Sequence, residues 1–318
     1  MQTDMTVGKP MKMLLNFTIP VFLGNVFQQL YSMADAVIVG KFVGTKGLAA
    51  VGATGTITFL IIGFLMGVTT GVTVLTSQKF GAGRMDEMRK TVGNAAILSA
   101  VIAVVMTAVS MLGMHRLLVF MHTPEDIFDG AYGYIMIICA GIFTQVLYNL
   151  VSSILRALGN SKTPLYFLIL AAGLNIVLDL VFIIFFHWGA PGAAWATVIS
   201  QGVSGVLCLI YMWKAVPELK MKKEDWYFNR DIAVKQISVG IPMGLQYSIT
   251  AIGGMMVQSY LNILGSYAVA AFTAGSKIDN IFTQAFVAIG TTMSTYSAQN
   301  VGARKLDRVR QGFRCADV

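Results

Sequence analysis

Charged residues are scarce in this sequence: only 12% of its 318 residues are Asp, Glu, Lys or Arg, whereas 56% are hydrophobic. The mean hydropathy is +0.69. Because soluble domains carry about 25% charged residues, this composition excludes an ordinary soluble protein. The apolar runs are long enough to cross a bilayer as helices, which need about 20 residues each. The sequence therefore predicts an all-α membrane protein built as a polytopic helical bundle.

Cysteine and histidine are also rare, with three residues of each. Cys139, Cys208 and Cys315 lie far apart and form no CxxC pair. Neither a disulfide framework nor a metal site is predicted from them. The sequence contains no combination of residues typical of a catalytic nucleophile or a nucleotide site. An enzyme and a bound cofactor are therefore not expected.

The net charge of +8 reflects membrane topology. Lys and Arg are concentrated in alternate loops between the apolar runs, as in the group Lys79, Arg84, Arg89 and Lys90. The positive-inside rule then places both termini of this multi-pass protein in the cytoplasm. No nucleic-acid partner is expected, whereas membrane lipid is an expected partner. The predicted helices span about 13–39, 51–77, 92–114, 130–154, 164–187, 190–213, 237–262 and 268–298.

The sequence contains an internal repeat. Ten positions from Gly44 to Arg89 recur later in the chain at one constant offset, as Gln78 and Gln299 illustrate. Six predicted helices separate the two copies, so both enter the membrane in the same direction, as in parallel-repeat transporters. We predict an N-terminal six-helix lobe (1–216), a solvated cytoplasmic linker (217–236) and a partial C-terminal lobe of two helices and a basic tail (237–318). Two full copies need on the order of 440 residues, so a C-terminally truncated fragment is expected.

Two acids lie within predicted helices. Counting 1.5 Å per residue, Asp179 lies roughly 13 Å below the outer end of its helix, Thr197 roughly 10 Å, and Asp35 roughly 8 to 13 Å. Asn175 precedes Asp179 by four residues and shares its helical face. These oxygen-bearing groups suit Na⁺ or H⁺, because hard cations prefer carboxylate, amide and hydroxyl oxygens. Asp35, Asn175, Asp179 and Thr197 are the predicted ion-coupling residues.

Each acid has a structural alternative. Asp179 is either a coupling-ion site or a structural acid hydrogen-bonded to Asn175, and intramembrane acids usually mark ion pathways. Asp35 is either part of the same site or an interfacial acid near Lys41. Two neighbouring carboxylates in an apolar medium resist being ionised together, so the pair can exchange a proton for an arriving cation.

Other polar residues predict a wet interior. Pro20 frees a backbone carbonyl in the first predicted helix and is the expected hinge there. Asn25, Gln28 and Ser32 follow helical spacing toward Asp35. The expected cavity-lining residues are Asn25, Gln28, Ser32, Gln246, Gln258 and Gln284.

Segments that cover most of the chain resemble the multidrug and toxic compound extrusion (MATE) family. They are IPVFLGNVFQQLYSMADAVIVG, QKFGAGR, RALGNSKTP, LNIVLDL, GAAWATVISQ, VAAFTAGSKID and QNVGARK. The resemblance implies twelve helices in two six-helix lobes, of which this chain holds one lobe and two helices. It also implies an ion site in the first lobe, which maps onto Asp35, Asn175, Asp179 and Thr197, and a bending proline, which maps onto Pro20. The glutamate that some members have in helix seven has no counterpart between Ile237 and Asn262.

The expected function is antiport: export of small amphipathic or cationic compounds in exchange for H⁺ or Na⁺. We expect a multi-pass protein of the bacterial inner (plasma) membrane that is monomeric when full length. One alternative is a lipid-linked oligosaccharide flippase of related fold. Such cargo is anionic and calls for Arg or Lys inside the cavity, whereas the sequence predicts an acidic, amide-rich interior with the basic residues outside it. The other alternative is a non-functional truncated membrane remnant.

Overall fold

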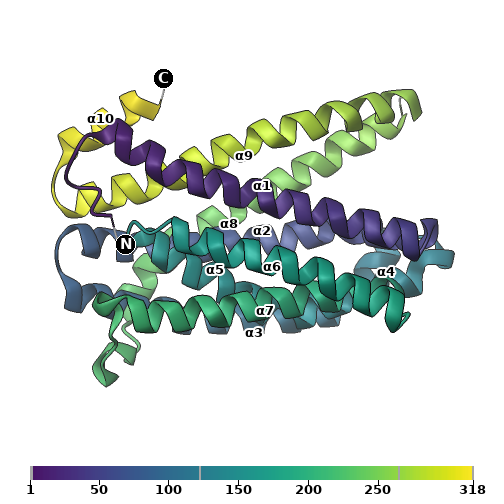
Figure 1. The fold of residues 1–318 in the computed structure, drawn as a ribbon, viewed down its shortest axis with the longest axis horizontal. Coiled ribbons are helices and arrows are strands. Elements are labelled where there is room, and N and C mark those ends of the chain that lie inside the picture. The colour runs from purple at the N-terminus through teal and green to yellow at the C-terminus, as the bar shows by residue number, and fades with distance from the viewer. Residues whose placement is uncertain (1–2, 122, 264–265, 317–318) are drawn as a thin grey trace.

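The computed structural model describes residues 3–121, 123–263 and 266–316. The described chain folds into long helices that run side by side, with both termini at the same end of the bundle (Figure 1). We call this end the terminal end and the opposite one the distal end. The helices are α1 Pro10–Phe42, α2 Thr45–Gly81, α3 Met85–Phe120, α4 Glu125–Ala140, α5 Ile142–Ala157, α6 Lys162–Leu180, α7 Gly189–Ala215, α8 Arg230–Ile263, α9 Ser266–Gly302 and α10 Leu306–Ala316.

The apolar composition predicted most of these helices correctly. Within the described residues, five helices are long and apolar enough to cross a membrane, or six if α4 and α5 form one bent span. Six is the number predicted for the first lobe. The two segments predicted after them are also helical, as α8 and α9. Most of these helices extend beyond both predicted ends, since the predicted ranges covered only the apolar runs.

The fourth predicted helix, 130–154, is divided into α4 and α5, which meet at an angle of 46°. The bend falls at Gly141, where a Cβ atom would lie 2.2 Å from the Val198 side chain. Because α7 approaches so closely, only glycine fits at this position. The prediction of a continuous helix was wrong here.

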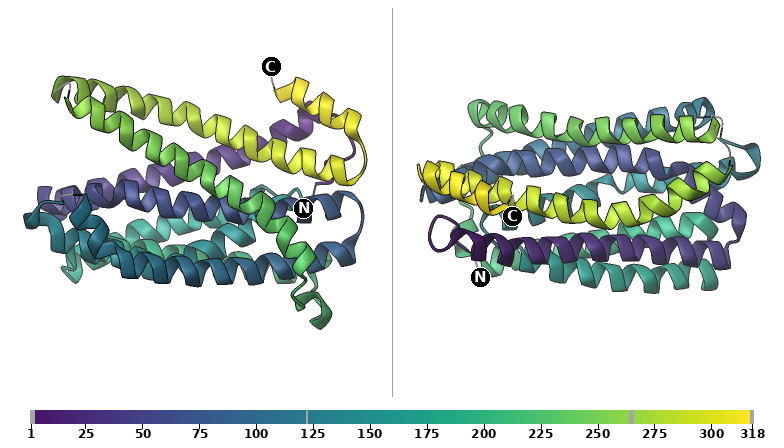
Figure 2. Two further views of the ribbon diagram at one scale, coloured as in Figure 1. Left: turned by 180° about the vertical axis from the view of Figure 1, so that it is seen from behind. Right: turned by 90° about the horizontal axis from the view of Figure 1, so that it is seen from above.

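The internal repeat is visible in the helix boundaries. Helices α2 and α9 both contain 37 residues, and their starts and ends are separated by the same offset as the sequence repeat. Helix α10 begins at that offset from the start of α3, so the basic tail predicted there is a helix that repeats the start of α3. Helices α8 and α9 pack on α2 and α1 near the terminal end and diverge from them toward the distal end (Figure 2).

Glycines allow the two repeats to approach at the terminal end. A Cβ atom on Gly81 would lie 2.0 Å from the Gln299 carbonyl oxygen, and one on Gly302 would lie 1.9 Å from that of Gln78. Gly81 and Gly302 are equivalent in the repeat, as are Gln78 and Gln299. The ends of α2 and α9 therefore contact each other through a symmetric pair of glycines.

The N-terminal segment is fixed to this contact. The Met5 N–H donates to Gln299 Oε1 at 2.9 Å, and Asn300 Nδ2 donates to the Met5 carbonyl at 3.1 Å. Gln299 Nε2 also donates to the Ala157 carbonyl at the end of α5, at 2.9 Å. One buried glutamine thus joins α5, α9 and the start of the chain.

The segment between α7 and α8 was predicted to be a solvated connector, and this was wrong for its inner face. Its residues Pro217–Leu219 and Lys223–Trp226 form short 3₁₀ turns. Asp225 is buried and lies 3.7 Å from Arg89 of α3, and its carbonyl lies so close to Gly93 that a Cβ there would be 2.1 Å away. The segment packs against α3 because a paired aspartate and a glycine make the close approach possible.

Candidate ion site and inter-repeat pocket

Three helices each contribute a polar pair at i,i+4 spacing to one buried cluster. The pairs are Tyr31 and Asp35 on α1, Asn175 and Asp179 on α6, and Thr197 and Gln201 on α7. Residues four apart lie on the same face of a helix, so each pair points into the space that the three helices share. We call these six residues, with Tyr134 of α4, the acid cluster.

The two carboxyl groups in the cluster face each other. Asp179 is fully buried and Asp35 is 9% exposed. Their side chains lie within hydrogen-bonding range of one another. Tyr134 is also buried, and it lies close enough to both acids and to Tyr31 to interact with them electrostatically. Helix α6 is followed by a π-helix at Val181–Phe185, which begins two residues after Asp179, and such local widening of a helix frequently occurs at functional sites.

Few donors reach the oxygen atoms of the cluster. Asn175 Nδ2 donates to Thr197 Oγ1 at 3.4 Å, and Gln201 Nε2 donates to Tyr31 Oη at 3.4 Å. Among the described residues, no hydrogen-bond donor pairs with the buried atoms Asp35 Oδ1, Asp179 Oδ1 and Oδ2, Asn175 Oδ1 and Gln201 Oε1. Oxygens left unpaired away from water are costly, and a proton or a hard cation would pair with them.

The four residues predicted to couple ions are therefore neighbours in the structure. Tyr31, Tyr134 and Gln201 were not predicted as part of this group. Tyr31 and Gln201 could have been found from their spacing, because each lies four residues from a predicted residue of the site. Tyr134 had no such signal, since only the packing of α4 brings it to the acids. The described residues contain no group of three His, Cys, Asp or Glu side chains that could hold a metal.

The predicted hinge and cavity residues are distributed unevenly. Pro20 is buried inside α1, which continues through it as one helix. A pocket of about 410 Å³, including space open to solvent, lies between α1, α2, α5 and α6 and is lined by Pro20, Asn25 and Gln28. Ser32 and Gln246 are exposed and Gln284 is half-buried, and none of them lines a described pocket. The Gln258 side chain lies outside the described residues.

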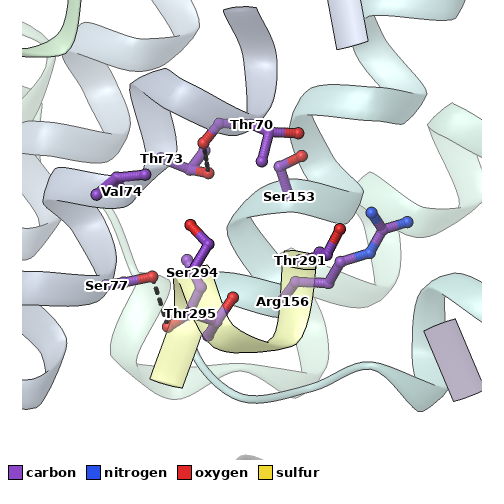
Figure 3. Close-up of a pocket in the computed structure, with 10 residues that line it drawn as sticks. Thr70, Thr73, Val74, Ser77, Ser153, Arg156, Thr291, Ser294 and Thr295 are labelled. Atoms are coloured by element: carbon purple, nitrogen blue, oxygen red, sulfur yellow. Dashed lines mark hydrogen bonds between the residues drawn. The ribbon is translucent and has the colours of Figure 1, made fainter. Parts of the chain in front are cut away.

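A second pocket, of about 280 Å³ including space open to solvent, lies between α2, α5 and α9 (Figure 3). We call it the inter-repeat pocket. Three of its residues on α2 are the repeat equivalents of three on α9: Thr70 and Thr291, Thr73 and Ser294, Val74 and Thr295. The pocket is therefore centred where the two repeats face each other.

Arg156 lines both pockets, and the prediction that all basic residues lie outside the interior was wrong for it. The reason is helix length. Helix α5 continues to Ala157, three residues past the predicted end, and so carries Arg156 in its last turn rather than in a loop. On that turn the side chain extends past Thr291 of α9, and its guanidinium lies on the side of the pocket away from α2 (Figure 3).

The helices are long enough to span a membrane, they surround a buried acid cluster, and a pocket lies between the two repeats. These features define an integral membrane protein of the multi-pass transporter class. The comparisons give the family: the model of the MatE family matches residues 20–181 and 242–316, and the chain belongs to this family. Members of the family are transporters and not enzymes.

Two curated relatives illustrate the range of the family. A probable multidrug resistance protein, YpnP of Bacillus subtilis, is 32% identical over 96% of this chain and 68% of its own length. An FAD transporter of Shewanella oneidensis is 25% identical over 95% of this chain and 68% of its own length. The chain thus spans about two thirds of the length of these relatives.

Solved structures agree with the fold. A MOP superfamily transporter from Pyrococcus furiosus, described as having a binding pocket of reverse polarity, superposes with a TM-score of 0.92 at 25% identity and covers 98% of this chain and 70% of its own. A MATE structure in a straight conformation gives a TM-score of 0.91 and one in a bent conformation gives 0.90, at 25% and 26% identity. They cover 98% and 99% of this chain and 70% and 71% of their own chains.

Proposed function

We propose that the chain takes part in ion-coupled export of small amphipathic compounds across the bacterial plasma membrane, with H⁺ or Na⁺ exchanged at the acid cluster. The observation that carries this proposal is the pair Asp35 and Asp179, held face to face by α1 and α6 with three buried carboxylate oxygens that no described donor reaches. The name of the B. subtilis relative, a probable multidrug resistance protein, supports a drug-like cargo. The proposal needs no resident cofactor, because the ion is itself a transported species.

The acid cluster can couple an ion to a second substrate only if its affinity for the ion differs between conformations. The two acids lie on different helices, so a shift of α1 relative to α6 changes the distance between them. Separated carboxylates tolerate two negative charges, whereas facing ones favour a proton or a cation between them. Such a difference supplies coupling energies of about 1 to 3 kcal/mol.

The proposed orientation follows the charges at the two ends of the bundle. Lys79, Arg84, Arg89 and the basic residues of α10 lie at the terminal end, which we assign to the cytoplasm by the positive-inside rule. The divergence of α8 and α9 from α1 and α2 then opens toward the outside. The acid cluster lies in the half of the membrane nearer that side, because Asp35 is close to the distal end of α1 and Asp179 to that of α6.

The test replaces Asp179 with Asn, which keeps the shape and removes the negative charge. Purified chain in proteoliposomes is assayed for ethidium movement under a pH gradient and under a Na⁺ gradient. Asp129→Asn is the matched control, since Asp129 is exposed near the distal end and forms no described ion pair. We expect the gradient-driven component to be lost in Asp179→Asn and kept in Asp129→Asn. Undiminished gradient-driven movement in Asp179→Asn contradicts the proposal.

A second measurement does not depend on transport. Infrared difference spectra of the purified chain, recorded on adding Na⁺ or on changing the pH, report protonation of buried carboxylic acids through their carbonyl stretch. We expect a carboxylic-acid band that responds to one of the two ions in the wild-type chain and in Asp129→Asn. The band should be lost or displaced in Asp179→Asn, and an unchanged band in that variant argues against the site.

A further inference from the structure

The inter-repeat pocket combines a single positive charge with a wall of hydroxyl groups. Arg156 is the only charged residue lining either described pocket. The hydroxyl residues that line the inter-repeat pocket come from α2, α5 and α9, and Figure 3 shows Thr291 beside the Arg156 side chain: Thr70, Thr73, Ser77, Ser153, Thr291, Ser294 and Thr295. Hydroxyl groups donate hydrogen bonds as readily as they accept them, so the wall can serve an anion.

The guanidinium of Arg156 has no partner of opposite charge. Among the described residues no Asp or Glu oxygen lies within 4.0 Å of it, and no described hydrogen bond uses its nitrogens. The residue is only half exposed. A guanidinium presents several donors in a fixed plane that match a carboxylate or phosphate, so an unpaired one in a pocket is prepared for an anionic group.

Several hydroxyl groups are also free to turn toward a ligand. Thr73, Ser77 and Thr291 donate to backbone carbonyls, of Thr70, Ala157 and Val287 respectively. The hydroxyls of Thr70, Ser153, Ser294 and Thr295 form no hydrogen bond with any other described residue, and they are not sealed from the pocket. Four free hydroxyls and one unpaired guanidinium therefore line the same pocket.

The inter-repeat pocket lies close to the contact between α2 and α9 and shares Arg156 with the pocket along α1. Ser77 lines the pocket on its terminal side and lies four residues before Gly81. The pocket therefore ends about one helical turn from the contact between α2 and α9. Since Arg156 also lines the pocket along α1, a molecule whose charged group contacts this residue can place an apolar part against Val21, Leu165 or Leu168. A polar end and an apolar end of one molecule are thus both accommodated.

We infer that the inter-repeat pocket is a subsite for the anionic group of an amphipathic substrate, a carboxylate or a phosphate ester, bound by Arg156 and the hydroxyls of α2, α5 and α9. This inference rests on the proposed function, since it names the chemical class of the cargo. It concerns binding at the terminal end, whereas coupling concerns the acid cluster near the distal end. A result that rejects the anion subsite therefore leaves the ion site testable, and a result that rejects the ion site leaves the subsite testable.

The test uses three fluorescent probes that share a naphthalene ring and differ in charge: 1-naphthyl phosphate, 1-naphthalenemethanol and 1-naphthylmethylammonium. Each is titrated into the purified full chain in detergent. In Arg156→Gln we expect the affinity for the phosphate to fall at least about tenfold, as lost hydrogen bonds to a charged group imply. The affinity for the alcohol should stay the same, and the ammonium should bind as well or better. Arg156→Lys should keep a preference for the phosphate over the alcohol.

The matched control is Arg116→Gln, which removes the same charge from an exposed position of α3 that lines neither described pocket. It should leave all three affinities unchanged. If Arg156→Gln does not stay monodisperse, Ser294→Ala and Ser153→Ala carry the test, and each should weaken only the phosphate, by a few fold. The inference is overturned if Arg156→Gln binds the phosphate within twofold of the wild type, if it weakens the three probes equally, or if Arg116→Gln has the same effect.

The binding test and the transport test separate the two proposals. Suppose that phosphate binds preferentially through Arg156, and that Asp179→Asn keeps undiminished gradient-driven transport. Those results would retain the subsite and reject the ion site. Lost transport in Asp179→Asn with no effect of Arg156 on binding would do the reverse.

Discussion

The contact between Gly81 and Gly302 allows a quantitative prediction. A Cβ atom on Gly81 would lie 2.0 Å from a backbone carbonyl oxygen of α9, and one on Gly302 would lie 1.9 Å from a carbonyl oxygen of α2, whereas ordinary contact begins at 3.4 Å. Alanine at either position therefore forces the ends of α2 and α9 apart until the methyl group reaches ordinary contact distance. Because the obstacle is backbone, no side-chain rotation relieves it.

The expected loss of stability follows from two opposing terms. Overpacking a tight contact costs about 1 to 3 kcal/mol, and alanine in place of glycine in a helix returns about 1 kcal/mol. The controls Gly52→Ala on α2 and Gly290→Ala on α9 supply only the second term, since nothing lies within 4 Å of a Cβ at either position. Gly81→Ala and Gly302→Ala should thus each be about 1 to 3 kcal/mol less stable than the control on the same helix.

The double variant tests whether the two glycines belong to one contact. Either substitution alone separates the helices and makes room for the other, so the combined loss should be smaller than the sum of the two. The assay is thermal unfolding of the purified chain in detergent, followed by circular dichroism. Equal melting temperatures for Gly81→Ala and Gly52→Ala, or strictly additive losses in the double variant, would refute the reasoning.

Three further predictions concern the terminal end and the thiols. Gln299→Ala removes hydrogen bonds with Met5 and Ala157, so it should lower the free energy of unfolding by about 1 to 3 kcal/mol and speed proteinase K cleavage of the segment before Pro10. Gln246→Ala, at an exposed position, should do neither. Arg89→Gln removes the contacts with Asp225 and the Glu218 carbonyl, so proteolysis between residues 217 and 229 should become faster; unchanged cleavage would contradict the packed connection described above. In the native chain a maleimide should modify the half-exposed Cys315 and spare the buried Cys139 and Cys208. The labelled residues are identified by mass spectrometry, and labelling of either buried thiol before Cys315 would show that its packing is looser than described.

Some features of the site were readable from the sequence and others were not. Asp179 with Asn175 was predicted because an acid in an apolar segment is conspicuous and its i,i+4 neighbour shares its face. Placing Asp35 at the same depth required only the helical rise. Tyr134 and the inward position of Arg156 could not be predicted, because they depend on how α4 packs and on where α5 ends. The bend at Gly141 was missed because a single glycine in an apolar run is typical of helix packing as well as of a break.

The helical membrane class, the internal repeat and the helices that carry the acids can be derived from the amino-acid sequence alone, because hydropathy and periodicity are local properties of the chain. The packing of the helices was needed to show that Asp35 and Asp179 face each other, that Gly81 and Gly302 join the two repeats, and that Arg156 lines the pocket between them. Those facts depend on which helix faces meet, and helix faces meet according to the fit of side chains from distant parts of the chain.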